Sequence, residues 1–100
     1  MNIKIYQIKE KDDLIMKFLF TSIDRLKNGI KDVDINNYDI VYEFEYHNEL
    51  TETNEILEDI FRIFNIARPT VFYGHSLSVS DIIELDGEKY FCNDFGFVKL

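Results

Sequence analysis

The stretch that most constrains the fold is residues 39–46, DIVYEFEY, because its apolar and acidic side chains alternate. Extended backbone places alternate residues on opposite faces, whereas a helix would scatter both sets around its axis. The sequence therefore predicts a β-strand whose more apolar face carries Ile40, Tyr42, Phe44 and Tyr46. Its other face is assigned Asp39, Val41, Glu43 and Glu45.

A helical pattern follows over residues 51–65. The apolar positions recur every three or four residues and form one stripe: Ile56, Leu57, Ile60, Phe61 and Phe64. Thr51 is suited to the N-terminal cap, and Pro69 ends the region. We expect this segment to be the main helix of the fold.

Residues 2–9 predict an opening strand with one face buried. The buried face is assigned Ile3, Ile5 and Ile8. The other face is assigned Lys4 and Gln7. The apolar run Leu14–Phe20 fits either a strand or an irregular core segment.

Asp86-Gly87 separates two β-prone runs, 81–85 and 89–93, as a two-residue hairpin turn does. Residues 95–100 are expected to add a last short strand. The predicted fold is a single α+β domain over residues 1–100. It consists of a small antiparallel or mixed β-sheet packed against one main helix (about 51–65), with a C-terminal β-hairpin.

The composition limits the compartment and the partners. Hydrophobic residues make up 46% of the 100 residues, enough for one core. Cys92 is the only cysteine, and no run resembles a signal peptide or a membrane span, so we expect a cytoplasmic protein. The net charge of −8 disfavours direct binding to nucleic acid or anionic membranes and favours a basic protein partner.

The acidic charge is concentrated between Asp32 and Phe61, a stretch with ten carboxylates and no Lys or Arg. The predicted strand and helix place several of these carboxylates on exposed faces, where like charges repel one another. A basic partner would relieve that repulsion, although a solvated face explains the same composition. The partner-binding face assigned on this basis comprises Asp39, Glu43, Glu45, Glu49, Glu52, Glu55, Glu58 and Asp59.

A distinctive motif lies in the C-terminal third, where PTVFYGHSLSVSDII is followed by YFCNDFGF. Together with IYQIK, YDIVYEFE and LEDIFRIFN upstream, this motif resembles the YodL-like domain family over most of the chain. The resemblance implies an accessory role on mobile elements of Gram-positive bacteria and carries over no activity or catalytic residues. The family-motif loop comprises Phe72, Gly74, His75, Ser76, Ser78, Ser80 and Asp81.

Turn chemistry explains much of this loop. Gly74 permits a backbone angle that other residues disfavour, and Asp81 can accept backbone hydrogen bonds at the entry to a strand. The serines alternate with Leu77 and Val79, which predicts a polar face and a face that enters the core.

An alternative function is a small-ligand or enzymatic domain centred on the 72–81 loop and Cys92. It requires a pocket that brings His75, Cys92 and Asp94 within hydrogen-bonding distance. Another alternative is a structural protein-interaction module that pairs through the apolar hairpin. We predict no metal site and no cofactor, because histidines are few and nucleotide-binding motifs are missing.

Our first hypothesis is a non-enzymatic acidic binding module encoded by a mobile element. It would engage a basic, nucleic-acid-binding protein, such as a host defence or DNA-processing factor, as an inhibitor or adaptor. An anti-CRISPR or anti-restriction role is a specific version of this hypothesis. The oligomeric state is left open.

Overall fold

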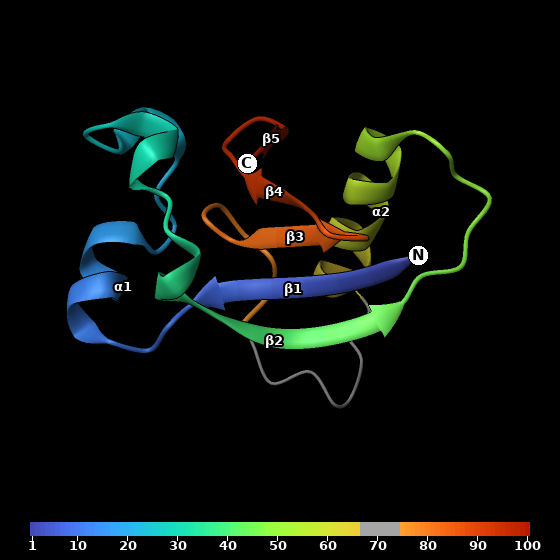
Figure 1. Cartoon of the computed structure of the whole chain (residues 1–100), viewed down its shortest axis with the longest axis horizontal. Helices are drawn as coiled ribbons and strands as arrows, with labels where there is room; N and C mark the ends of the chain where they lie inside the picture. Colours follow the sequence, from blue (N-terminus) through green and yellow to red (C-terminus); the bar gives the residue numbers. More distant parts are fainter. Residues whose placement is uncertain (67–74) are drawn as a thin grey trace.

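One antiparallel sheet of five strands organises the described part of the chain, residues 1–66 and 75–100 of a computed structural model (Figure 1). Its strands are β1 (Asn2–Ile8), β2 (Tyr38–Glu45), β3 (Ile82–Leu85), β4 (Glu88–Cys92) and β5 (Phe97–Lys99). The order across the sheet is β2-β1-β3-β4-β5, and every neighbouring pair is antiparallel. The predicted α+β class is confirmed.

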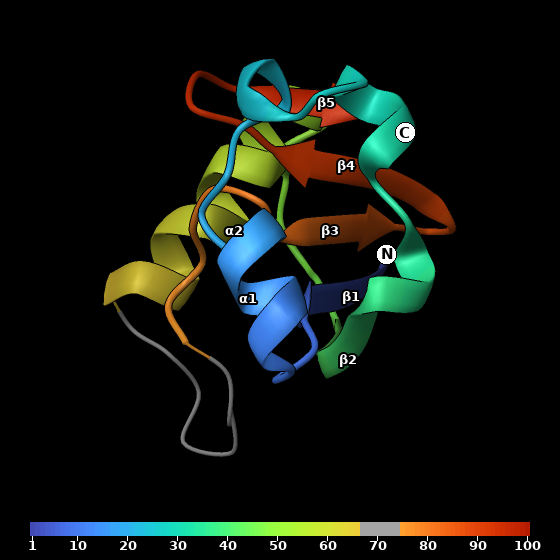
Figure 2. The ribbon, with the colours of Figure 1, turned by 90° about the vertical axis from the view of Figure 1, so that its left-hand side faces the viewer.

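Helical segments cover both faces of the sheet, as Figure 2 shows. The main helix, α2 (Thr53–Ile66), packs on one face and confirms the predicted helix, with its start two residues later. The other face is covered by α1 (Asp12–Phe18) and by short 3-10 helices at η1 (Ile23–Arg25), η2 (Gly29–Asp32) and η3 (Ile35–Asn37). No helix within residues 1–66 or 75–100 is long and apolar enough to cross a lipid bilayer.

The core on the α2 side depends on the predicted apolar stripe of the helix. Ile56, Leu57, Ile60 and Phe64 are buried there against Ile3 and Ile5 of β1 and Ile83 of β3. The Phe64 ring packs against Tyr42 and Phe44 of β2, with centroid distances of 5.6 and 5.5 Å. These contacts attach the helix to an edge strand as well as to the centre of the sheet.

A second core lies on the opposite face and contains Tyr6, Ile8, Tyr38, Ile82 and Phe91. Leu14 and Phe18 of α1 pack against it. The expectation of a strand or irregular segment over 14–20 is therefore wrong, because most of that run is helical. Leu14 and Phe18 lie four residues apart, which places both on one helix face.

A buried carboxylate, Glu84, sits on the same face of the sheet as this second core. It accepts a hydrogen bond from Tyr6 Oη at 2.8 Å and lies 3.3 Å from Lys89 Nζ and 3.8 Å from Lys4 Nζ. Burial, followed by the contact with Glu84, raises the pKa of Tyr6 to about 12. Glu84 is thus internally neutralised across three adjacent strands.

A β-bulge divides β2 into two halves. Ile5 pairs with Tyr42 while the next residue, Tyr6, pairs with Ile40, so Val41 is the extra residue. Ile40 consequently faces away from the side occupied by Tyr42, and its side chain is 51% exposed. The prediction that Ile40, Tyr42, Phe44 and Tyr46 share one face is wrong at Ile40, because the bulge shifts the alternation by one residue.

The faces of β1 need two corrections. The sequence predicts that Ile8 shares a face with Ile3 and Ile5, but Ile8 packs with Tyr6 in the second core, on the opposite face. Gln7 was assigned to the face opposite Ile3 and Ile5, yet strict alternation places all three on the α2 side. Gln7 is only 3% exposed, so it is a buried polar residue rather than a surface one.

The C-terminal hairpin follows the prediction closely. Asp86 and Gly87 have φ angles of 47° and 90°, and they join β3 to β4. Two successive residues with positive φ are typical of the turn that matches the twist of a hairpin.

The α2 core yields the first testable prediction. Phe64→Ala should lower the free energy of unfolding by about 3 kcal/mol or more, because it removes a fully buried ring between two aromatic neighbours. Phe95→Ala is the matched control, since Phe95 is 94% exposed. Urea unfolding measures both, and equal effects of the two substitutions would contradict the described core.

Candidate functional site

Buried polar side chains gather at the end of the sheet where β1 stops and β3 starts. Continuing the register places Gln7 of β1 opposite Asp81, and Asp81 opposite Cys92 of β4, all on the α2 side. His75 approaches this row from the family-motif loop. We call Gln7, His75 and Asp81 the polar cluster.

Gln7 fixes the position of His75 through its backbone. The Gln7 Oε1 atom accepts the His75 N–H at 3.1 Å, and Gln7 Nε2 donates to the His75 carbonyl at 2.8 Å. Gln7 Nε2 also donates to Asp81 Oδ2 at 3.2 Å. The amide therefore joins β1, the loop and the start of β3 at one point.

Asp81 is fully buried and is held by directed hydrogen bonds. Its Oδ2 atom accepts the Ser78 N–H at 3.0 Å in addition to the bond from Gln7. This confirms the expectation that Asp81 accepts a backbone hydrogen bond at the entry to a strand. Burial outweighs these two bonds and raises the pKa of Asp81 to about 8, so most of the carboxyl is protonated near neutral pH.

The His75 ring lies beside the Asp81 carboxyl. Its Nδ1 atom lies 2.6 Å from the Ser76 carbonyl oxygen and 3.2 Å from Gln7 Nε2. Nε2 lies 3.7 Å from Asp81 Oδ1, and neither atom has a hydrogen-bond partner within the described residues. The distance of 3.7 Å between these two atoms is too long for a hydrogen bond.

Ser80, which directly precedes Asp81, is held in an unusual backbone conformation by hydrogen bonds. Its φ of 84° is unusual for a residue with a side chain. Three partners hold it: the Phe20 N–H donates to Ser80 Oγ at 3.0 Å, Tyr38 Oη donates to its carbonyl at 2.6 Å, and its own N–H donates to the Cys92 carbonyl at 2.9 Å. The prediction of a polar serine face is wrong at Ser80, which is 1% exposed, because these bonds turn it inward.

Cys92 belongs to the core and does not face a solvent-accessible site. It is 1% exposed, and burial, together with the nearby Asp81, raises the pKa of its thiol well above the usual range. Asp94 is exposed, and no hydrogen bond joins His75, Cys92 and Asp94 among the described residues. His75 instead lies next to Asp81, a pairing that the sequence did not suggest.

An open groove lies beside the polar cluster, between α1, the end of β1 and the start of β2. Its volume is about 850 Å³, and the His75 ring forms part of its wall with Gln7. The groove is lined by segments that are far apart in the sequence, so the pattern of side chains along the chain did not predict it.

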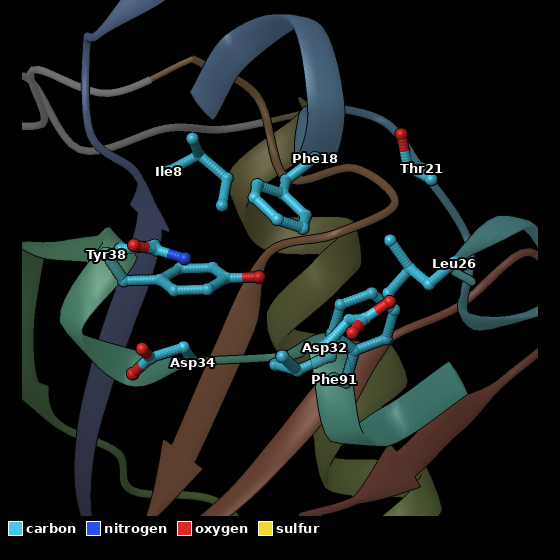
Figure 3. Close-up of a pocket in the computed structure, with 10 residues that line it drawn as sticks. Ile8, Phe18, Thr21, Leu26, Asp32, Asp34, Tyr38 and Phe91 are labelled. Carbon is cyan, nitrogen blue, oxygen red and sulfur yellow. The ribbon is translucent and has the colours of Figure 1, made fainter. Parts of the chain in front are cut away.

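A second cavity, shown in Figure 3, is enclosed by Phe18, Tyr38, Phe91 and their neighbours. Its volume is about 10 Å³. A space of this size has room for about one water molecule, so it is a packing feature and not a ligand pocket.

Two of the predicted acidic residues on β2, Glu43 and Glu45, occupy the sheet face opposite α2. Glu43 pairs with Lys4 across the strands and accepts a hydrogen bond from Asn2 Nδ2 at 3.1 Å. Glu45 lies 3.3 Å from the amino terminus. Asp39 pairs with Gln7 at the other end of the strand and lies on the α2 side of the sheet. The prediction that it shares a face with Glu43 and Glu45 is therefore wrong, because the bulge shifts the alternation.

The acidic residues around α2 form a different surface. Glu49, Glu52, Glu55 and Glu58 are all exposed, and none has an ion-pair partner within the described residues. Asp59 differs, because Tyr46 Oη, Asn48 Nδ2 and Arg62 all donate to its carboxylate. The bonds from Tyr46 and Arg62 lower the pKa of Asp59, which makes it a structural residue of the helix.

The family-motif loop is described only from His75 onward, and Phe72 and Gly74 lie outside the described residues. Ser76 is exposed, whereas Ser78 is half-buried and its Oγ has no partner within the described part of the chain. Within this loop, Ser76 contacts the ring of His75 and Ser78 donates its N–H to Asp81. No group of three or more potential metal ligands occurs among residues 1–66 and 75–100.

Comparisons with known proteins agree with the resemblance of the sequence. The family model described as YodL-like domain matches residues 2–100. No curated protein and no solved structure matches the chain.

The buried carboxyl leads to a prediction for the pH dependence of stability. Asp81 has a pKa of about 8 when folded and about 4 when unfolded, so the folded state binds the extra proton between these values. Its contribution to stability therefore falls as the pH rises from about 4 to 8. Asp81→Asn removes this titration and should gain about 1–3 kcal/mol relative to the unmodified protein between pH 5 and pH 8.

Urea unfolding at several pH values measures this difference. Asp94→Asn provides a control with the same chemical change at an exposed position. Parallel stability curves for Asp81→Asn and the unmodified protein would show that Asp81 does not titrate as described.

Proposed function

The chain belongs to the YodL-like domain family, and we propose that it is a non-enzymatic acidic binding module. In this proposal it is encoded by a mobile element and acts in the cytoplasm. It engages a basic, nucleic-acid-binding protein as an inhibitor or adaptor. An anti-CRISPR or anti-restriction inhibitor is one specific form of such a module.

The observation that carries the proposal is the acidic surface around α2. Four exposed carboxylates, Glu49, Glu52, Glu55 and Glu58, lie within ten residues, and none is paired in the described part of the chain. Glu55 and Glu58 lie three residues apart, as do Glu52 and Glu55, so they are neighbours on the helical surface or its entry. No residue in the described part of the chain relieves their mutual repulsion.

A basic protein would relieve this repulsion on binding. Carboxylates at such spacing present a row of negative charge to the Lys and Arg side chains that otherwise contact phosphates. The net charge of −8 extends the attraction over a distance that depends on ionic strength. The β2 residues Glu43 and Glu45 supply a weaker contribution, since Asn2 and the amino terminus already contact them.

The test is a charge reversal that leaves the structural carboxylate Asp59 intact. The triple variant Glu52→Lys, Glu55→Lys and Glu58→Lys changes only exposed residues. Asp24→Lys, Glu88→Lys and Asp94→Lys form a matched control with the same change in net charge at other exposed positions. The immobilised proteins are exposed to nuclease-treated bacterial lysate, and captured proteins are identified by mass spectrometry.

We expect a basic nucleic-acid-binding protein to be captured by the unmodified protein and by the control, and to be displaced by duplex DNA. Its affinity for the triple variant should be at least about tenfold weaker, since several close charge pairs change sign. Equal capture by the triple variant, or capture of no basic protein at low salt, would refute the proposal.

A further inference from the structure

The groove beside the polar cluster has an apolar floor on an otherwise charged domain. Ile15 of α1 and Ile40 of β2 line it and are 38% and 51% exposed. Leu19 and Val41 also line the groove. Large aliphatic side chains that remain exposed within one groove are typical of a protein contact surface.

The β-bulge is the reason that Ile40 reaches this groove. Uninterrupted alternation would turn Ile40 to the same side as Tyr42, under α2. The extra residue, Val41, turns it to the other side instead. Bulges are common where a strand has to re-aim a side chain near a functional surface.

The groove is also acidic. Its walls include the carboxylates of Glu10, Asp12 and Asp39, and no Lys or Arg is found among the described residues that line it. Asp12 and Asp39 come from α1 and β2, so acidic side chains lie on both sides of the apolar floor. Figure 2 shows α1 beside the ends of β1 and β2.

We propose that this groove binds a basic amphipathic segment of a partner protein. Aliphatic side chains of the segment pack on Ile15 and Ile40, while its Lys or Arg side chains pair with Asp12 and Asp39. This inference rests on the proposed function, because it assigns a docking site to the basic partner. The acidic surface of α2 then attracts the partner over distance, and the groove selects it by shape and apolar contact.

The dimensions of the groove suit such an occupant. Its volume of about 850 Å³ is as large as the roughly 300–1,000 Å³ of common ligand pockets, enough to take several side chains of a bound segment. An amphipathic segment places anchoring side chains at helical spacing into a groove of this kind. A nucleic acid would be repelled by the three carboxylates.

Three synthetic peptides test the inference. The first places Leu and Lys on opposite faces of a helix, the second replaces Lys with Glu, and the third contains Lys without Leu. Fluorescence anisotropy measures each affinity, and amide chemical-shift changes locate the contact. The variants are Ile15→Ser with Ile40→Ser, Asp12→Asn with Asp39→Asn, and the α2 triple reversal described above.

We expect the Leu/Lys peptide to bind best and to shift amides of α1 and the first half of β2. Ile15→Ser with Ile40→Ser should weaken that peptide about tenfold and leave the Lys-only peptide unchanged, because the carboxylates are retained. Asp12→Asn with Asp39→Asn should weaken both basic peptides. The altered side chains are exposed, and circular dichroism verifies that each variant is folded.

The two proposals fail in different ways. If the Leu/Lys peptide binds equally to the unmodified protein and to the Ile15→Ser, Ile40→Ser variant, the groove is not the docking site. Loss of binding in the α2 triple variant alone would then leave the proposed function standing. If neither basic peptide binds more tightly than the Glu peptide at low salt, both proposals are wrong.

Discussion

The amide of Gln7 is the interaction on which the end of the sheet depends. Its side chain bonds to the backbone N–H and carbonyl of His75 and to the carboxyl of Asp81. The pairing of β1 with β3 ends at Tyr6 and Ile82, and these side-chain bonds connect the two segments beyond that point. Asp81 in turn accepts the Ser78 N–H and anchors β4 through its own carbonyl, which accepts the Cys92 N–H. His75, which forms part of the groove wall, is held in place by this junction.

Periodicity was sufficient to predict the elements that bury one face. The stripe of α2, the alternation of β2 and the Asp86-Gly87 turn are local patterns, and each appears in the structure near its predicted place. The α1 segment was missed because a seven-residue amphipathic run is too short for the two periods to be distinguished. The bulge at Val41 could not be predicted, because it is a property of two paired strands and not of either sequence.

Of the candidate functional residues, only the exposed carboxylates around α2 could be predicted from the sequence. The exposed carboxylates of α2 follow from a helix with one apolar face, whereas the internal role of Asp59 depends on Tyr46 and Arg62, which reach it from either side in the sequence. The pairing of His75 with Asp81 and the burial of Gln7 arise from tertiary contacts separated by many residues. A polar residue on an otherwise aliphatic strand face, such as Gln7 after Ile3 and Ile5, was the available signal.

The bulge in β2 has a consequence for how the domain holds together. Tyr38 packs in the core covered by α1, whereas Tyr42 and Phe44 pack in the core covered by α2, although all three occupy even-numbered positions of one alternating run. One inserted residue lets a single strand belong to both hydrophobic layers. The two cores are therefore connected through the backbone of β2 at Val41. Loss of either core would disturb the pairing of β2 with β1, on which the other core also depends. Such sharing favours unfolding of the whole domain in one cooperative step.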